Sequence, residues 1–278
     1  MINNELKIVI GHKPCVYDIP SDWYTITTDP DNKKDFYVED DYIWTKNGDA
    51  DALGDFSYLI PLAKKLKSMP EIQTIRLAQY RKVVCNSKLL NLVYRINSNF
   101  YILTRKDLKL YNFNKVTSPL QSDFLLPPFF IVNSKLEKTY QFETILHHYK
   151  TCHHIEDLLL FIKDAILCDA ITINDADAIL HSNKFLIGGI GLGVFPKDLF
   201  INIIEQAEKV LNVYYKNSWI KRNDSYQYRS INFLLEIFTS YLILQELKKR
   251  NIDIPKVLGH LMVIDENYQY QTGKIKHD

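Results

Sequence analysis

The sequence predicts an α/β fold, with a mixed sheet flanked by helices and a more helical C-terminal half. Early in the chain, short apolar runs typical of strands alternate with a helical segment, as in α/β proteins. After residue 140, apolar residues recur at helical spacing over long stretches. Only 9 of the 278 residues are glycine, which disfavours an all-β array of tight turns.

The first half is expected to contain one long helix and several short strands. The helix is expected over 53–66, where Leu59, Ala63 and Leu66 share one face, and Pro70 lies just beyond its end. The first strand is a buried apolar run that ends at Gly11. The strands are expected over residues 6–10, 23–27, 74–78 and 99–104.

The second half is expected to be mostly helical. Segment 230–249 is apolar on most faces, which is typical of a buried helix. Segment 185–195 holds four of the nine glycines, and we expect a strand that another group approaches closely. The other helices are expected over residues 139–150, 155–167 and 199–214.

Composition narrows the class of protein. The length suits one domain, residues 1–278, with a sizeable core. The 34 Lys and Arg nearly cancel the 33 Asp and Glu, and the net charge of +1 argues against a dedicated nucleic-acid binder. The four cysteines are widely separated and no signal peptide opens the chain, so we expect an intracellular protein with reduced thiols.

The near-zero net charge hides two blocks of opposite sign. Residues 29–55 carry nine Asp and Glu against three Lys, whereas residues 64–115 carry twelve Lys and Arg against two acids. Such blocks are either ordinary solvated faces or opposite sides of one site. The basic block would also suit contact with anionic lipid headgroups.

Two loops near the ends of expected elements carry candidate binding residues. Gly11, His12 and Lys13 follow the first strand, and strand carboxyl ends form the ligand crevice of open α/β sheets. An ordinary polar turn is the alternative for this loop. Asp49 and Asp51 precede the first helix, where they would bind Mg²⁺ or Mn²⁺, bind a hydroxyl group or simply cap the helix.

A basic stretch follows the strand expected over 74–78. Arg76, Arg81 and Lys82 lie close to Tyr80 in the sequence, and guanidinium groups bind phosphate oxygens through two hydrogen bonds. The stretch therefore suits a diphosphate. An exposed strand end without a ligand is the alternative.

Candidate catalytic groups follow in the second half. Four His and a Cys lie within 147–154, which is compatible with zinc, although no second ligand pair has a known spacing. Asp157, near a helix start, would be a general base, an acceptor ligand or a cap. Glu236 lies in an apolar helix two turns after Arg229, and such a carboxylate needs a partner, in an ion pair or in a site.

Taken in order, these segments resemble a bacterial glycosyltransferase-like family of capsular polysaccharide and lipopolysaccharide biosynthesis. Each motif is short, so their order from about residue 6 to residue 245 carries the resemblance. The resemblance implies a GT-A-like fold with a nucleotide-sugar half (about 1–120) and an acceptor half (about 121–278). The matching segments are 7–14, 48–49, 79–82, 123–127, 154–158, 185–195 and 233–236.

The resemblance implies transfer of a sugar from a nucleotide-sugar donor to a glycan or lipid-linked glycan, in the cytoplasm or at the inner membrane surface, without nucleic acid. Asp157, Arg81 and Glu236 are the expected catalytic residues. Because a cationic side chain can replace a metal beside a diphosphate, we expect Arg81 and Lys82 to make the transfer metal-independent, with no cofactor. Mn²⁺ or Mg²⁺ at the Asp49–Asp51 turn is the alternative. The expected donor ligands are Gly11, His12, Lys13, Asp49, Asp51, Tyr80 and Lys82, and the expected acceptor ligands are His154 and Gly189.

Two other functions remain open from the sequence. The same fold would serve a catalytically silent protein that binds a glycan or a nucleotide. The His-rich segment would serve a zinc-dependent hydrolase. Donor turnover distinguishes the first from a transferase, and metal analysis of the purified protein identifies the second.

Overall fold

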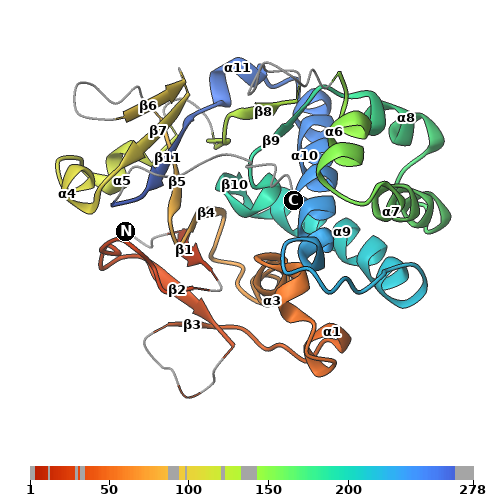
Figure 1. Cartoon of the computed structure of the whole chain (residues 1–278). Coiled ribbons are helices and arrows are strands. Elements are labelled where there is room, and N and C mark those ends of the chain that lie inside the picture. Colours follow the sequence, from red (N-terminus) through yellow and green to blue (C-terminus); the bar gives the residue numbers. More distant parts are fainter. Residues whose placement is uncertain are drawn as a thin grey trace.

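The computed structural model describes residues 4–11, 13–28, 31, 35–86, 94–97, 99–119, 123–132 and 143–266. It confirms the expected fold class, because helices flank a central mixed sheet (Figure 1). In Figure 1 the sheet occupies the left of the view, and most of the long helices gather on the right.

Four neighbouring strands of the central sheet run parallel, and their carboxyl ends share one edge. At that edge Ile10 pairs with Gln79. β5 and β10 both run antiparallel to β4, and Gln79 pairs with Lys82 across a tight hairpin. The order is β3 (Phe36–Tyr37), β2 (Tyr24–Thr27), β1 (Glu5–Ile10), β4 (Thr74–Gln79), β5 (Lys82–Cys85), β11 (His260–Ile264), β7 (Phe100–Leu103) and β6 (Tyr94–Asn97), with β10 (Gly193–Pro196) also paired to β4.

The helices are concentrated in the second half of the chain. Among the described residues, no helix is long and apolar enough to cross a membrane. The helices are α1 (Ile43–Lys46), α2 (Ala50–Leu53), α3 (Phe56–Leu66), α4 (Arg105–Leu108), α5 (Phe113–Val116), α6 (Ile145–Cys152), α7 (Ile155–Leu167), α8 (Ile173–His181), α9 (Lys197–Asn217), α10 (Ser230–Lys249) and α11 (Ile254–Val257). Two 3₁₀ turns, η1 (Gly189–Gly191) and η2 (Gln227–Arg229), and a small sheet of β8 (Phe129–Ile131) and β9 (Lys184–Leu186) complete the fold.

Alternating side chains on β1 and β4 contribute to two cores. Ile8 faces the larger core, which is completed by α3, α9 and α10. Val9 and Ala78 face the other side, where Tyr17 and Leu108 cover them. Because successive residues of a strand point to opposite faces, one short apolar run supports both cores.

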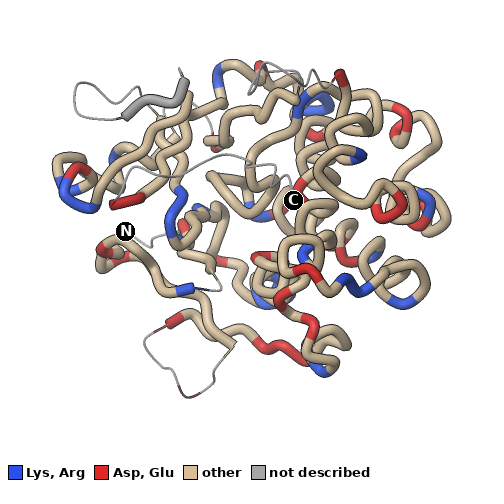
Figure 2. The backbone as a smooth tube through the Cα atoms, viewed as in Figure 1, with Lys and Arg blue, Asp and Glu red and all other residues tan. Residues whose placement is uncertain are grey.

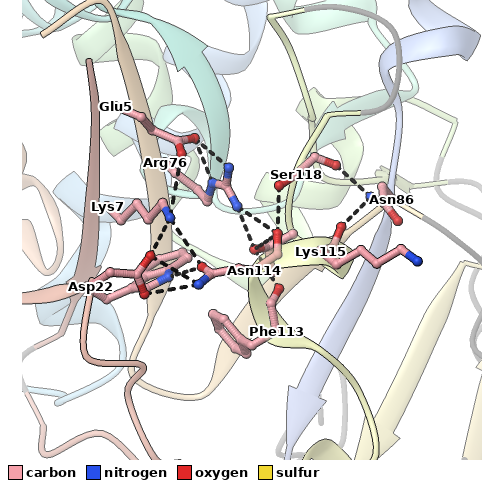
Figure 3. Close-up of polar contacts among 11 residues, drawn as sticks. Glu5, Lys7, Asp22, Arg76, Asn86, Phe113, Asn114, Lys115 and Ser118 are labelled. Atoms are coloured by element: carbon pink, nitrogen blue, oxygen red, sulfur yellow. Dashed lines mark hydrogen bonds and ion pairs between the residues drawn. The ribbon is translucent and has the colours of Figure 1, made fainter. Parts of the chain in front are cut away.

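A partly buried polar network ties α5 to the amino-terminal ends of β1 and β4 (Figure 3). The guanidinium of Arg76 donates to Glu5 Oε1 at 2.6 and 2.9 Å and to the carbonyl of Asn114 at 3.0 Å. Lys7 Nζ pairs with a carboxylate oxygen of Asp22 at 2.5 Å. Arg76 therefore contributes to the fold, near the opposite end of β4 from the predicted diphosphate site.

Some predicted elements match the structure, and two differ for physical reasons. α7 and α10 begin and end as expected. The helix expected over 53–66 is divided, because Gly54 has a φ of 53° and ends α2 before α3 begins. The strand expected over 185–195 was wrong as one element, since Gly188 and Gly189 have positive φ and form a turn between β9 and β10, which belong to different sheets. For the helix expected over 139–150, the described part begins at Ile145 and residues 139–142 lie outside the described residues.

The two charge blocks differ in how they lie on the fold. Figure 2 shows acidic residues along the chain between β3 and α1. The basic block is instead divided among separate ion pairs, since Lys67 pairs with Glu205 and Lys109 Nζ lies 2.9 Å from Asp18. The basic block therefore does not form one charged surface, and each of its cations has to be considered by its own position.

Candidate active site

The carboxyl ends of β1 and β4 meet at a glycine. The backbone N–H of Tyr80 donates to the carbonyl of Ile10 at 2.9 Å. A Cβ atom on Gly11 would lie 2.8 Å from the Cβ of Tyr80, so a larger residue would force the strand ends apart. At the tip of the hairpin, the guanidinium of Arg81 lies 5.4 Å from the centre of the Tyr80 ring.

Two carboxylates and two cations gather beside these strand ends. We call Asp55, Lys82, Arg229 and Glu236 the charged cluster. Asp55 precedes α3, Lys82 begins β5, Arg229 precedes α10 and Glu236 lies within α10. The positive charges of Lys82 and Arg229 both lower the pKa values of Asp55 and Glu236, which places the four groups within electrostatic reach of one another. Chain segments separated by about 180 residues thus share one charged environment.

Amide side chains hold both carboxylates of the charged cluster. Gln79 Nε2 donates to Asp55 Oδ2 at 2.6 Å, and Asn232 Nδ2 donates to Glu236 Oε1 at 2.8 Å. Burial raises the pKa of both carboxyls above their ordinary values, and the two cations oppose this increase. A carboxyl group with a fixed orientation and a raised pKa is typical of sites that exchange protons with a substrate.

Two glycines allow the neighbouring backbone to approach α10 closely. Gly54 has a φ of 53°, and a Cβ there would lie 2.6 Å from Asn232 Oδ1. Gly189 has a φ of 52°, and a Cβ there would lie 2.8 Å from the carbonyl oxygen of Glu236. The expected close approach in the glycine-rich segment is therefore made to the helix that carries Glu236.

Asp49 is a buried anchor in this structure, with 5% of its surface exposed. Its Oδ1 accepts hydrogen bonds from Lys221 Nζ at 2.5 Å and from the Tyr228 hydroxyl at 2.9 Å, and its Oδ2 accepts one from the Tyr215 hydroxyl at 2.6 Å. Burial alone would raise the pKa of Asp49, but these hydrogen bonds hold it below its ordinary value. Both carboxylate oxygens therefore already have protein partners.

The other residues expected to bind the donor or a metal lie in open positions or outside the described chain. Asp51, on α2, and Lys13 are exposed, and His12 lies outside the described residues. Within the described ranges, no three His, Cys, Asp or Glu side chains are close enough together to hold a metal ion.

Asp157, which we expected to act as a base, is fully buried in the first turn of α7. Its Oδ1 accepts a hydrogen bond from Arg222 Nη2 at 2.8 Å, and its Oδ2 has no partner in the part of the chain that the structure describes. Burial raises the pKa of this carboxyl, and Arg222 opposes the increase. An acceptor would reach Asp157 only if the overlying side chains moved, so the geometry favours an anchoring role.

Asp49 and Asp157 hold the same stretch of chain, residues 218–229, which we call the anchored segment. Lys221 and Tyr228 bind Asp49, whereas Arg222 binds Asp157. The anchored segment leads directly into α10 and ends in Arg229. The two buried carboxylates therefore fix the position of one cation of the charged cluster.

The His-rich joint between α6 and α7 forms an aromatic contact. The ring of His153 stacks on that of Tyr226, with 5.3 Å between the centroids and 13° between the planes. His148 Nδ1 lies 3.8 Å from Cys152 Sγ. Among the described residues, no third His, Cys, Asp or Glu lies close enough to complete a zinc site with this pair. His154, an expected acceptor ligand, is exposed at the start of α7.

Sequence patterns predict some of the residues that the structure brings together at this site and miss others. The structure brings Gly11, Tyr80 and Arg81 to one strand end and places Gly189 against the backbone of Glu236. Arg229 is predicted only as an ion-pair partner of Glu236, two turns away; in the structure its charge acts on Glu236, whose hydrogen-bond partner is Asn232. The residues that sequence analysis missed are Asp55, Gln79 and Asn232. Two of them could have been found from the sequence, since Asp55 directly follows Gly54 at a helix start and Asn232 lies one helical turn before Glu236.

Comparison with known proteins supports the fold. No family model and no curated protein sequence matches the chain. The apo structure of the WbbM bifunctional glycosyltransferase superposes with a TM-score of 0.66 at 14% sequence identity, over 94% of this chain and 46% of that one. The chain thus spans about half the length of that protein. The two proteins share an α/β fold in which helices flank a mixed central sheet.

Proposed function

We propose that this protein is a glycosyltransferase that moves a sugar from a nucleotide-sugar donor to a glycan acceptor. The observation that carries the proposal is the charged cluster beside the carboxyl ends of β1 and β4, the edge at which open α/β sheets bind ligands. The fold shared with a glycosyltransferase structure supports it.

The cations are assigned to the leaving nucleoside diphosphate. Lys82 and Arg229 belong to the charged cluster, and Arg81 lies at the adjoining hairpin tip. Negative charge grows on the diphosphate as its bond to the sugar breaks, and fixed cations stabilise that charge. We expect full activity in excess EDTA and its collapse in Arg81→Ala. Strict Mn²⁺ dependence would contradict this assignment of the cations.

The carboxylates are assigned to hydroxyl groups. Glu236 would accept the proton of the attacking acceptor hydroxyl while the new glycosidic bond forms. Its hydrogen bond from Asn232 fixes its orientation, and the pKa of Glu236, raised by burial, suits a proton acceptor. Asp55, oriented by Gln79, would bind a hydroxyl of the donor sugar. Asp157 would act indirectly, by anchoring the segment that ends in Arg229.

The acceptor is proposed to be a precursor of a surface glycan of the capsule or lipopolysaccharide type, free or linked to a lipid. A lipid-linked acceptor would bring the protein to the cytoplasmic face of the inner membrane, where exposed cations such as Lys13 would meet anionic headgroups. Sedimentation with vesicles of anionic phospholipid tests this placement, and binding is expected to weaken as salt is added.

Calorimetric titration with UDP-, GDP-, ADP- and CMP-linked sugars tests the donor site. We expect at least one diphosphate-linked donor to bind, and Arg229→Gln to weaken it about tenfold or more, because a hydrogen bond to a charged group contributes about 1.5–3 kcal/mol. The matched control is Arg250→Gln, which removes an arginine that pairs with Asp198. Absence of donor binding, or equal binding by Arg229→Gln, contradicts the proposal. Binding without turnover identifies the silent binding protein.

A further inference from the structure

An exposed tyrosine borders the charged cluster. Among the described Phe, Tyr and Trp residues, Tyr226 and Tyr24 are the ones with about half of their surface exposed, at 50% and 48%. Tyr226 stacks on His153 at 5.3 Å, and its centroid lies 5.0 Å from that of Phe233 at 43°. We call these three rings of His153, Tyr226 and Phe233 the aromatic platform. The half-exposed Tyr226 forms its outer surface.

The backbone and the underlying ring are both held in place. Asp224 Oδ1 accepts hydrogen bonds from the backbone N–H groups of Tyr226 and Gln227, at 2.9 and 2.8 Å. The Gln227 side chain lies 3.3 Å from His153 Nδ1 and donates to the carbonyl of Cys152 at 3.0 Å. Burial lowers the pKa of His153 to about 4, so this ring is neutral at pH 7. The aromatic platform is therefore uncharged, and hydrogen bonds hold the Tyr226 backbone and the His153 ring.

The aromatic platform adjoins the side of the charged cluster that α10 provides. The guanidinium of Arg229 lies 5.9 Å from the centre of the Phe233 ring. Although half of its surface is exposed, Tyr226 is partly desolvated, which raises its pKa to about 12, and the charge of Glu236 adds to this increase. Glu236 is thus close enough to Tyr226 for its negative charge to oppose ionisation of the tyrosine hydroxyl. The strand ends at Gly11, where a nucleotide is expected in this fold class, adjoin the charged cluster through Gln79, which pairs with Ile10 and donates to Asp55.

We propose that Tyr226 forms a stacking subsite for a pyranose ring of the acceptor glycan. This inference rests on the proposed function, and it deepens it by assigning the acceptor position. One face of a pyranose consists of C–H groups, which pack against an exposed aromatic ring, while its hydroxyls remain free for polar partners. A tyrosine ring gives a large contact surface with little loss of side-chain entropy. Exposed His154, next to His153 in the chain, lies on the same joint and would meet such hydroxyls.

Saturation-transfer NMR tests this subsite without requiring turnover. The probes are methyl β-D-galactopyranoside and methyl β-D-glucopyranoside, added to the full chain. We expect saturation of sugar C–H protons with wild type, with Tyr226→Phe and with Tyr24→Ala, the control for an equally exposed ring. Tyr226→Ala is expected to lose about fivefold to tenfold of the signal. If Tyr226→Ala does not fold, as judged by circular dichroism, Tyr226→Leu replaces it, because leucine keeps apolar bulk without an aromatic face.

The inference is overturned if neither glycoside binds to wild type, or if the variants that lack the ring bind both as wild type does. Its failure is distinguishable from that of the proposed function. Glycoside binding that requires Tyr226, with no donor bound by wild type, supports the subsite and refutes the transferase. Donor turnover with an acceptor KM unchanged in Tyr226→Ala supports the transferase and overturns the subsite.

Discussion

Replacing Asp49 by asparagine keeps the size of the side chain but removes the charge on which the anchored segment depends. The carboxylate accepts hydrogen bonds from Lys221, Tyr215 and Tyr228. Hydrogen bonds to charged groups contribute about 1.5–3 kcal/mol and neutral ones about 0.5–1.5, so converting three of them costs about 3 kcal/mol. Lys221 is 59% exposed, and water screens its share. We therefore expect Asp49→Asn to lower the free energy of unfolding by about 2–3 kcal/mol.

Urea unfolding followed by circular dichroism, with chelated protein at pH 7, measures this loss. Asp51→Asn is the matched control, because Asp51 is exposed two residues away, and a change within about 0.5 kcal/mol is expected. Hydrogen bonding holds the pKa of Asp49 below its ordinary value of 3.8, so the stabilisation is present above that pH. It is lost as the pH falls through the folded-state pKa. Equal effects of the two variants would refute the anchoring role, as would a loss below about 0.5 kcal/mol in Asp49→Asn.

Three further perturbations test other contacts. Because burial holds the pKa of His153 at about 4 against an ordinary 6.5, the unfolded chain binds its proton first. The free energy of unfolding should thus fall as the pH is lowered from 6.5 to 4. His153→Phe should make this dependence on pH shallower, and an unchanged dependence contradicts the reasoning. Gly54→Ala should cost about 2–4 kcal/mol in thermal unfolding, because its Cβ would lie 2.6 Å from a side-chain oxygen of α10. Gly48 has a φ of 74° and no atom within 4 Å of an added Cβ, so Gly48→Ala should lower the free energy of unfolding by only about 1 kcal/mol. Equal losses in the two variants would show that the Cβ at residue 54 does not collide with α10. Arg222→Met should lower the free energy of unfolding by about 3–5 kcal/mol, because it leaves the buried charge of Asp157 unpaired. The double variant with Asp157→Leu should recover part of this loss, and additive losses would show that the two side chains do not interact.

Elements with strong local periodicity could be predicted closely from the sequence. α7 and α10 are examples, because their apolar residues recur at helical spacing from end to end. β11 could not be predicted in its place, since this five-residue strand inserts between β5 and β7 and pairs with residues about 160–180 positions earlier. β10 likewise joins β4. The two halves expected at 1–120 and 121–278 therefore share one sheet.

In the site, too, residues at neighbouring strand ends could be predicted from the sequence, whereas contacts between distant segments could not. Gly11, Tyr80 and Arg81 could be placed together, because strand carboxyl ends meet at one edge of the sheet. The placement of Asp55 within electrostatic reach of Arg229 could not be predicted, since it depends on how α3 meets α10 around a single left-handed glycine. An acid at a helix start can be a cap, a base or an anchor, and the partner that decides this for Asp157 lies 65 residues away.

Release of nucleoside diphosphate under single-turnover conditions tests glycosyl transfer at the charged cluster most directly. The donor is the one identified by calorimetry, and wild type is compared with Glu236→Gln, which keeps an oxygen for the hydrogen bond from Asn232. We expect Glu236→Gln to bind the donor with nearly wild-type affinity and to release diphosphate at least about 100-fold more slowly, as loss of a general base predicts. Equal release rates in the two proteins would contradict catalysis at this cluster.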